Sequence, residues 1–172
     1  MHERYLMLKK VFLAAAVVVA ACTLSQAADY SKVPNPMKNA KVGQWVHYKI
    51  MGGMEQKQTI SAIEGEGDDR IITIKADTIQ GGNVLQSQEM KINLKDAKAQ
   101  EEQNRQAAGD NVTITEEKIT HNGKSYDAIV IEATANGMSS KVYMAEAIPV
   151  SGMIKTEVQG MGAMMELVDF GE

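Results

Sequence analysis

The sequence predicts a mainly β protein: a curved antiparallel sheet or half-open barrel of about nine strands, with one short polar helix. Apolar and polar residues alternate along short segments rich in β-branched side chains, as they do in half-buried strands. Turn-forming Gly, Asn and Pro separate these segments at short intervals. Helix-forming residues dominate a single stretch, so strands and helices do not alternate as they would around a parallel sheet.

Residues 1–28 have the organisation of a secretory signal peptide. Basic side chains precede the apolar run Val11–Ala21, which is too short to span a bilayer comfortably. Ser25-Gln26-Ala27 has the small residues that signal peptidase prefers before its cut, and this would release a periplasmic or secreted domain. Val19-Ala20-Ala21-Cys22 also resembles a bacterial lipobox, although Leu is usual where Val19 stands. That alternative predicts a membrane-anchored lipoprotein attached through Cys22.

The charge balance argues against several classes of partner. The chain has 18 Lys plus Arg and 22 Asp plus Glu, a net charge of −4. Three basic residues and one acidic residue fall within 1–28, so the remainder has 15 basic and 21 acidic side chains and a net charge of −6. This acidic domain is not expected to bind nucleic acid by charge attraction. Cys22 is the single cysteine, which excludes a disulfide framework, and no later apolar run is long enough for a transmembrane helix.

Three segments follow the signal peptide. Residues 29–41 contain Pro34 and Pro36 and are expected to form an extended lead-in. Residues 42–172 are expected to form a single antiparallel β domain. Its strands are predicted at 45–50, 55–63, 71–74, 84–94, 112–120, 126–134, 141–145, 153–158 and 164–170. A polar helical excursion at 95–109, with alanines as its apolar residues, separates the fourth strand from the fifth.

Several strand and turn segments carry a resemblance to known proteins: Val42–Tyr48, Lys141–Met144, Ile148–Lys155 and Glu166–Gly171. Together they resemble small, exported, uncharacterised bacterial β-sheet proteins. The general layout is also similar to the periplasmic lipoprotein-carrier half-barrel, which holds acyl chains. The first resemblance implies structure without an activity, and the second implies an apolar interior that is open to a ligand.

The sequence contains no recognisable catalytic motif, so an enzyme is not expected. His47 and His121 are the histidines beyond residue 28. His47 could serve as a general base, but no serine lies in a nucleophile-elbow sequence. His121 precedes the Asn122-Gly123 hairpin turn, where an exposed position is expected.

Methionine is the unusual feature of the composition, because ten of the 12 methionines lie beyond residue 28. Soft thioether ligands select copper(I), so Met-rich turns offer one functional hypothesis: a periplasmic copper(I)-binding protein. Methionine also fills cores and adaptable binding surfaces, and we favour that interpretation here. The residues that would hold copper are Met51, Met54, Met161, Met164, Met165 and His47.

Our preferred hypothesis is a non-enzymatic cell-envelope domain that binds a lipophilic small molecule or an apolar segment of an envelope protein, without a cofactor. Such a site needs a largely apolar cavity in the curved sheet. The predicted lining residues are Tyr48, Ile50, Ile74, Met90, Ile92, Met144 and Val168. A third hypothesis is a structural or partner-interaction module that uses an exposed strand edge.

Overall fold

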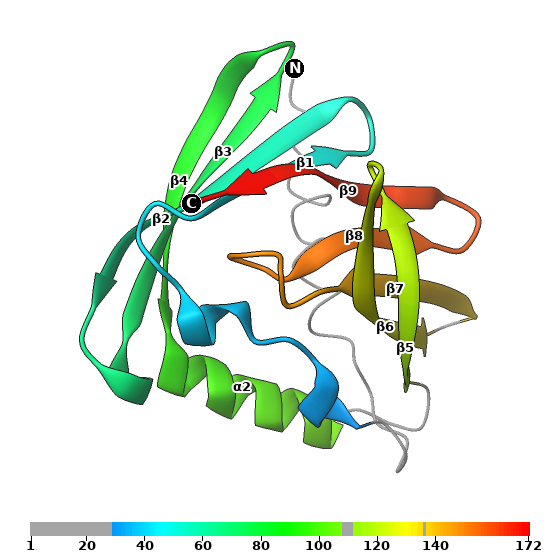
Figure 1. Cartoon of the computed structure of the whole chain (residues 1–172), viewed down its shortest axis with the longest axis horizontal. Coiled ribbons are helices and arrows are strands. Elements are labelled where there is room, and N and C mark those ends of the chain that lie inside the picture. Colours follow the sequence, from blue (N-terminus) through cyan, green and yellow to red (C-terminus); the bar gives the residue numbers. More distant parts are fainter. Residues whose placement is uncertain (1–28, 108–111, 136) are drawn as a thin grey trace.

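The computed structural model describes residues 29–107, 112–135 and 137–172. Within these residues nine strands form one unclosed antiparallel sheet, which confirms the predicted fold class (Figure 1). The strands are β1 (Trp45–Ile50), β2 (Met54–Glu64), β3 (Ile71–Gln80), β4 (Asn83–Asn93), β5 (Val112–His121), β6 (Lys124–Ala135), β7 (Met138–Met144), β8 (Met153–Val158) and β9 (Gly162–Gly171).

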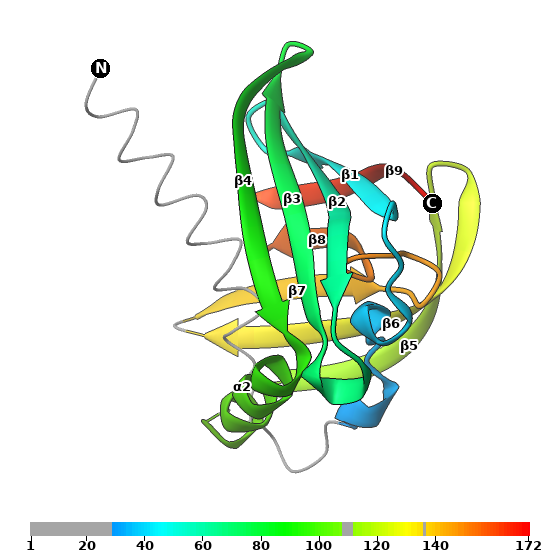
Figure 2. The ribbon, with the colours of Figure 1, turned by 90° about the vertical axis from the view of Figure 1, so that its left-hand side faces the viewer.

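The sheet consists of two meanders joined side by side. Its strand order is β4-β3-β2-β1-β9-β8-β7-β6-β5, so every neighbouring pair except β1 and β9 is a sequential hairpin. The predicted polar helix is α2 (Leu94–Ala107), which leaves β4 at one edge of the sheet and leads toward β5 at the other (Figure 2). The expected end of this helix at Gly109 lies outside the described residues. No helix in the described ranges is long and apolar enough to cross a membrane.

Alternation along the central strands places one face of the sheet in the core. In β1, Val46, Tyr48 and Ile50 are buried while Lys49 is exposed. Opposite residues in an antiparallel pair share a face, and Tyr48 and Ile50 are paired with Leu167 and Met165 of β9. The buried cluster comprises Ala40, Val46, Tyr48, Ile50, Ile60, Ile72, Ile74, Leu94, Tyr126, Ala128, Ala145, Ile148, Val150, Ile154, Met165 and Leu167.

The lead-in differs from the predicted extended segment, because it contains two short 3-10 helices, η1 (Tyr30–Lys32) and η2 (Pro36–Asn39). The Asp29 carboxylate accepts a hydrogen bond from the Ser31 amide and begins η1. Pro36 begins η2 with a φ angle that suits a helix. Arg70 then donates to the Lys38 carbonyl at 2.8 Å. The lead-in is thereby held along the open side of the curved sheet (Figure 1). A third 3-10 helix, η3 (Gly67–Asp69), lies in the β2–β3 connection.

The connection from β7 to β8 packs into the core, unlike an ordinary surface loop. Ile148 and Val150 in this loop are fully or almost fully buried. Val150 has a φ of 66°, a conformation that a β-branched residue rarely adopts. The Ala145 amide donates to the Gly152 carbonyl at 2.8 Å and closes the loop. This backbone conformation costs about 1–3 kcal/mol, and burial of the Val150 side chain compensates for that cost.

The far end of the sheet curls back onto its centre. At the tip of the β5–β6 hairpin, the Asn122 side-chain amide donates to the Leu167 carbonyl of β9 at 2.9 Å. A ring nitrogen of His121 lies 2.6 Å from the same oxygen. His121 is therefore half-buried, although an exposed position was expected.

Candidate functional site

The residues predicted to line an apolar cleft occupy three different environments. Tyr48, Ile50 and Ile74 belong to the buried cluster, and Ile92 packs against it from β4. Met90 and Val168 are 40% and 44% exposed. Val168 is the extra residue of a β-bulge, because the register passes from Leu167 opposite Tyr48 to Asp169 opposite His47.

Met144, the last of the predicted lining residues, is half-buried at the end of β7, where it is paired with Met153. Its methyl group lies 3.3 Å from the position that a Cβ on Gly152 would take. Met144 therefore packs against the start of β8. The structure does not gather the seven residues into one lining.

The methionines predicted as copper ligands are divided between the core and the surface. Met165 is 8% exposed, and Met54 packs against the buried cluster. Met51 and Met161 are 48% and 56% exposed at two turns, and Met164 is half-buried. Cys22, the alternative lipid anchor, lies outside the described residues.

His47, which could have joined the methionines in a copper site, contacts a carboxylate instead. Its Nε2 lies 2.7 Å from Oε2 of Glu55 on the neighbouring strand β2. His47 precedes Met51 by four residues along an extended chain, which corresponds to about 13 Å. The structure therefore separates His47 from the Met-rich turns.

A polar cluster lies on β6, β7 and β8. Glu132, Lys141 and Glu157 form one row of opposite residues across these strands. The Tyr143 hydroxyl donates to Glu157 at 3.0 Å, and Lys155 donates to the same carboxylate at 2.7 Å. Burial and the adjoining Glu157 carboxylate raise the pKa of Tyr143 to about 12, so this hydroxyl stays protonated.

The charges of this polar cluster largely compensate one another. Hydrogen bonds from Ser139 and Lys141 lower the pKa of Glu132, and the hydrogen bond from Lys155 has the same effect on Glu157. Both carboxylates are therefore stabilised as anions by partners on neighbouring strands. These cross-strand ion pairs and hydrogen bonds stabilise the pairing of β6, β7 and β8, so the polar cluster has a structural role that needs no ligand.

A pocket of about 180 Å³ opens where three segments distant in sequence meet. The lining residues come from the lead-in, the residue before β1, the β7–β8 loop and the end of β9, and Figure 1 shows the course of these segments. The lining residues are Asn35, Pro36, Asn39, Gln44, Glu146, Ala147, Ile148, Pro149, Phe170, Gly171 and Glu172.

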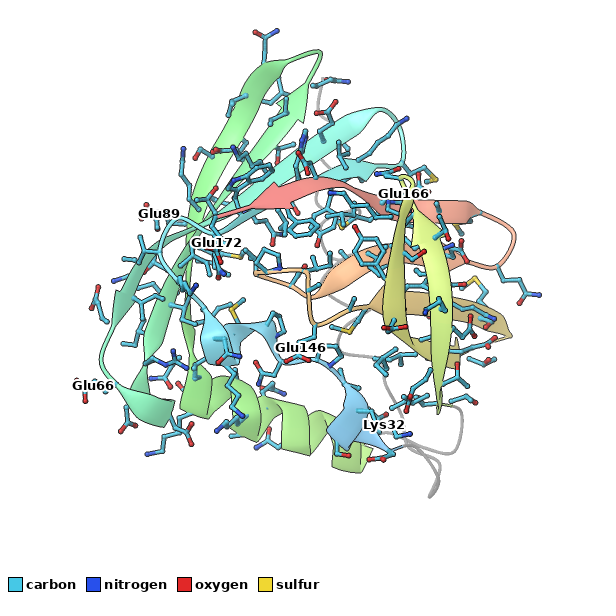
Figure 3. All side chains as sticks on the ribbon, in the orientation of Figure 1. Lys32, Glu66, Glu89, Glu146, Glu166 and Glu172 are labelled. Carbon is cyan, nitrogen blue, oxygen red and sulfur yellow. The ribbon has the colours of Figure 1, made fainter. Side chains whose placement is uncertain are left out.

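The pocket combines an apolar surface with acidic and amide groups. Pro36, Pro149 and Phe170 supply flat apolar contacts. Glu146 and Glu172, both labelled in Figure 3, supply carboxylates, and no basic side chain belongs to the lining. Lys41 lies outside the lining, with its Nζ 3.4 Å from Oε1 of Glu172, and both of these side chains are largely exposed. The chemistry of the pocket therefore favours a group that is both apolar and cationic.

Gly171 forms the pocket wall beside the single tryptophan of the chain. A Cβ at this position would lie 2.9 Å from Nε1 of Trp45 and 3.1 Å from two carbons of its ring. Gly171→Ala is therefore expected to displace the indole, to shift its fluorescence and to lower the free energy of unfolding by about 1–3 kcal/mol. Val168→Ala, three residues earlier on the same strand, is the control. Unchanged Trp45 emission in Gly171→Ala would contradict this close approach.

Sequence reasoning did not identify this pocket. Its walls come from the neighbourhoods of Asn35, Glu146 and Phe170. Asn35 lies more than a hundred positions before the other two in the sequence. The signal that could have pointed to it was the pair of prolines, Pro36 and Pro149, in segments that lack strand alternation. Proline favours turns and irregular backbone, but it does not reveal which loops meet.

In its architecture the described part of the chain is one open antiparallel sheet made of two meanders. Comparison with known proteins adds little to this description. No family model and no curated protein matches the sequence. One solved structure that resembles it is a Bacteroides fragilis protein described as exported and as having a YmcC-like fold. It is 7% identical, with a TM-score of 0.46, over 81% of this chain and 98% of that protein.

Proposed function

We propose that this protein is a non-enzymatic binding domain of the cell envelope that receives a segment of another protein at the pocket described above. The anchoring group is a basic side chain, arginine or lysine, whose aliphatic part lies on Phe170 and the two prolines. Its charged end faces Glu146 and Glu172. The observation that carries the proposal is the acidic and apolar lining of this pocket.

The size of the pocket supports a single side chain as its occupant. Pockets for whole small molecules commonly measure about 300–1,000 Å³. The volume here is about 180 Å³, which suits one anchoring side chain better than a free acyl chain. A segment lying across the lead-in and the β7–β8 loop would then make further contacts outside the pocket.

The polar groups of the pocket support a cationic occupant. Glu146 is exposed on the β7–β8 loop, and the Asn35 side chain makes no capping hydrogen bond to η2. A guanidinium has five donors and a flat apolar face, so it can bond to carboxylate and amide oxygens while it stacks on Phe170. The net charge of −6 beyond residue 28, from 15 basic and 21 acidic side chains, favours the approach of a basic segment.

The test is an NMR titration of the 15N-labelled protein with N-acetyl-arginine methylamide. The citrulline analogue, which has nearly the same shape without the charge, is the matched probe. We expect amide shifts at Asn39, Phe170 and Gly171 with the arginine compound and much smaller shifts with citrulline. Combining Glu146→Gln with Glu172→Gln should weaken arginine binding about tenfold or more, because charged hydrogen bonds are lost.

Glu89→Gln on β4 is the matched control, since Glu89 is an exposed carboxylate outside the pocket (Figure 3). It should leave arginine binding unchanged. Equal shifts with arginine and citrulline, or full binding by the double variant, would refute a cationic anchor.

A further inference from the structure

The two Met-rich turns lie side by side in the fold, although Met51 and Met161 are 110 positions apart in the sequence. The Met51 amide of the β1–β2 turn donates to the Met164 carbonyl of β9 at 2.9 Å. This bond extends the β1–β9 register by one step beyond the Ile50–Met165 pair. Opposite residues of antiparallel strands have Cβ atoms about 4.5–5.5 Å apart. Both thioethers can therefore reach one ion.

Met161 is the third methionine within reach. It lies three residues before Met164, in the turn that its own amide closes by donating to the Val158 carbonyl at 3.0 Å. Three residues of extended chain span at most about 10 Å. Because methionine is unbranched and has three rotatable bonds, the two sulfur atoms can approach a common point between these positions.

The surroundings leave room for such an arrangement. Gly52, Gly160 and Gly162 flank Met51 and Met161, and a Cβ added at any of them would meet no atom within 4 Å apart from those of its own chain neighbours. Met164 is the extra residue of a β-bulge relative to β8, since the register passes from Thr156 opposite Met165 to Glu157 opposite Ala163. A bulge redirects a side chain out of the regular alternation.

The local charge suits a soft monocation. Lys49 of β1 lies two residues before Met51, and Glu166 of β9 lies two residues after Met164. These two residues are directly opposite each other, so their formal charges offset. Three neutral thioethers then remain as the donors. Neutral sulfur ligands select copper(I) over zinc, magnesium or calcium, which prefer thiolate, imidazole or oxygen.

We propose that Met51, Met161 and Met164 form a copper(I) site at the paired β1–β2 and β8–β9 turns. This site is independent of the pocket and of the function proposed for it. Met54 and Met165 are not ligands, because they pack in the core on either side of Ile50. His47 is not a ligand, because of its distance and its contact with Glu55.

The test is titration of the full protein with copper(I) under nitrogen, in competition with bicinchoninate. All forms carry Cys22→Ser, because the thiol of Cys22 would otherwise compete for copper(I). We expect one tightly bound ion, and in protein labelled with 13C at the methionine methyl groups, shifts at Met51, Met161 and Met164. Replacing each of these by leucine should weaken binding at least about tenfold, and the triple variant should lose it. X-ray absorption of the complex should show sulfur neighbours.

Met90→Leu is the matched control, because Met90 is 40% exposed on the edge strand β4, and β3 and β2 separate that strand from β1. It should bind copper(I) as the unaltered protein does. Far-UV circular dichroism reports whether the leucine variants fold, and the methyl shifts of the unaltered protein test the site even if one variant does not. Absence of binding, undiminished binding by the triple variant, or an equal shift of the Met90 methyl would overturn the proposal.

Discussion

Tyr48→Ala is expected to lower the free energy of unfolding by about 3–5 kcal/mol, which is the range for removing a large buried aromatic side chain. Tyr48 is fully buried in the middle of β1. Its hydroxyl donates to the Met153 carbonyl at 2.9 Å and also contacts the Ser151 hydroxyl. The substitution therefore removes both core packing and the link between β1 and the start of β8. Urea unfolding followed by far-UV circular dichroism measures the effect.

Tyr48→Phe separates these two contributions. It keeps the ring and removes the hydroxyl, so a loss of about 1–3 kcal/mol is expected from the lost hydrogen bonds to the Met153 carbonyl and the Ser151 hydroxyl. Burial raises the pKa of Tyr48 well above its usual range, and a hydroxyl that stays protonated remains a hydrogen-bond donor. If both variants cost less than about 1 kcal/mol, Tyr48 does not occupy a close-packed core.

Ile148→Ala is expected to cost about 2–5 kcal/mol, although residue 148 lies in a loop. The Ile148 side chain is fully buried, and it also forms part of the pocket lining. Losing it would leave a cavity beneath the pocket and lower stability. The same urea titration gives the magnitude.

The control for Ile148→Ala is Val168→Ala, which removes a side chain that is 44% exposed on β9. This variant should change stability by no more than about 0.5 kcal/mol. The two substitutions distinguish a core filled by the β7–β8 loop from an open cleft that Val168 lines. A costly Val168→Ala together with a neutral Ile148→Ala would favour the cleft.

The fold could be predicted because strand alternation is a local property of the sequence. Val46, Tyr48 and Ile50 alternate with polar or amphipathic neighbours, and Asn122-Gly123 specifies a tight hairpin. Alternation also identified Tyr48, Ile50 and Ile74 as facing the interior. It did not show whether that interior is open or filled.

The predicted cleft, the Met-rich turns and the pocket all depend on contacts between distant residues, which local sequence patterns do not encode. A bulge at Val168 turned a residue predicted to face inward toward solvent. The two Met-rich turns could be found in the sequence, but their proximity follows from the pairing of β1 with β9. The pocket required the lead-in to turn at Pro36 and the loop around Ile148 to fold inward, and both depend on tertiary packing.

The pairing of β1 with β9 also has a consequence for how the chain folds. Every other strand pair is a hairpin, whose ends are brought together at small entropic cost. The β1–β9 pair joins residues more than a hundred positions apart, and distant contacts of this kind slow folding. Each meander contains mainly local strand contacts, so we expect the β1–β9 pairing that joins the meanders to be the slow step of folding. A circular permutant that begins at β5 and ends at β4 would join the end of β9 to the start of β1. The β1–β9 pair would then become one more hairpin, because Trp45 and Gly171 are already neighbours.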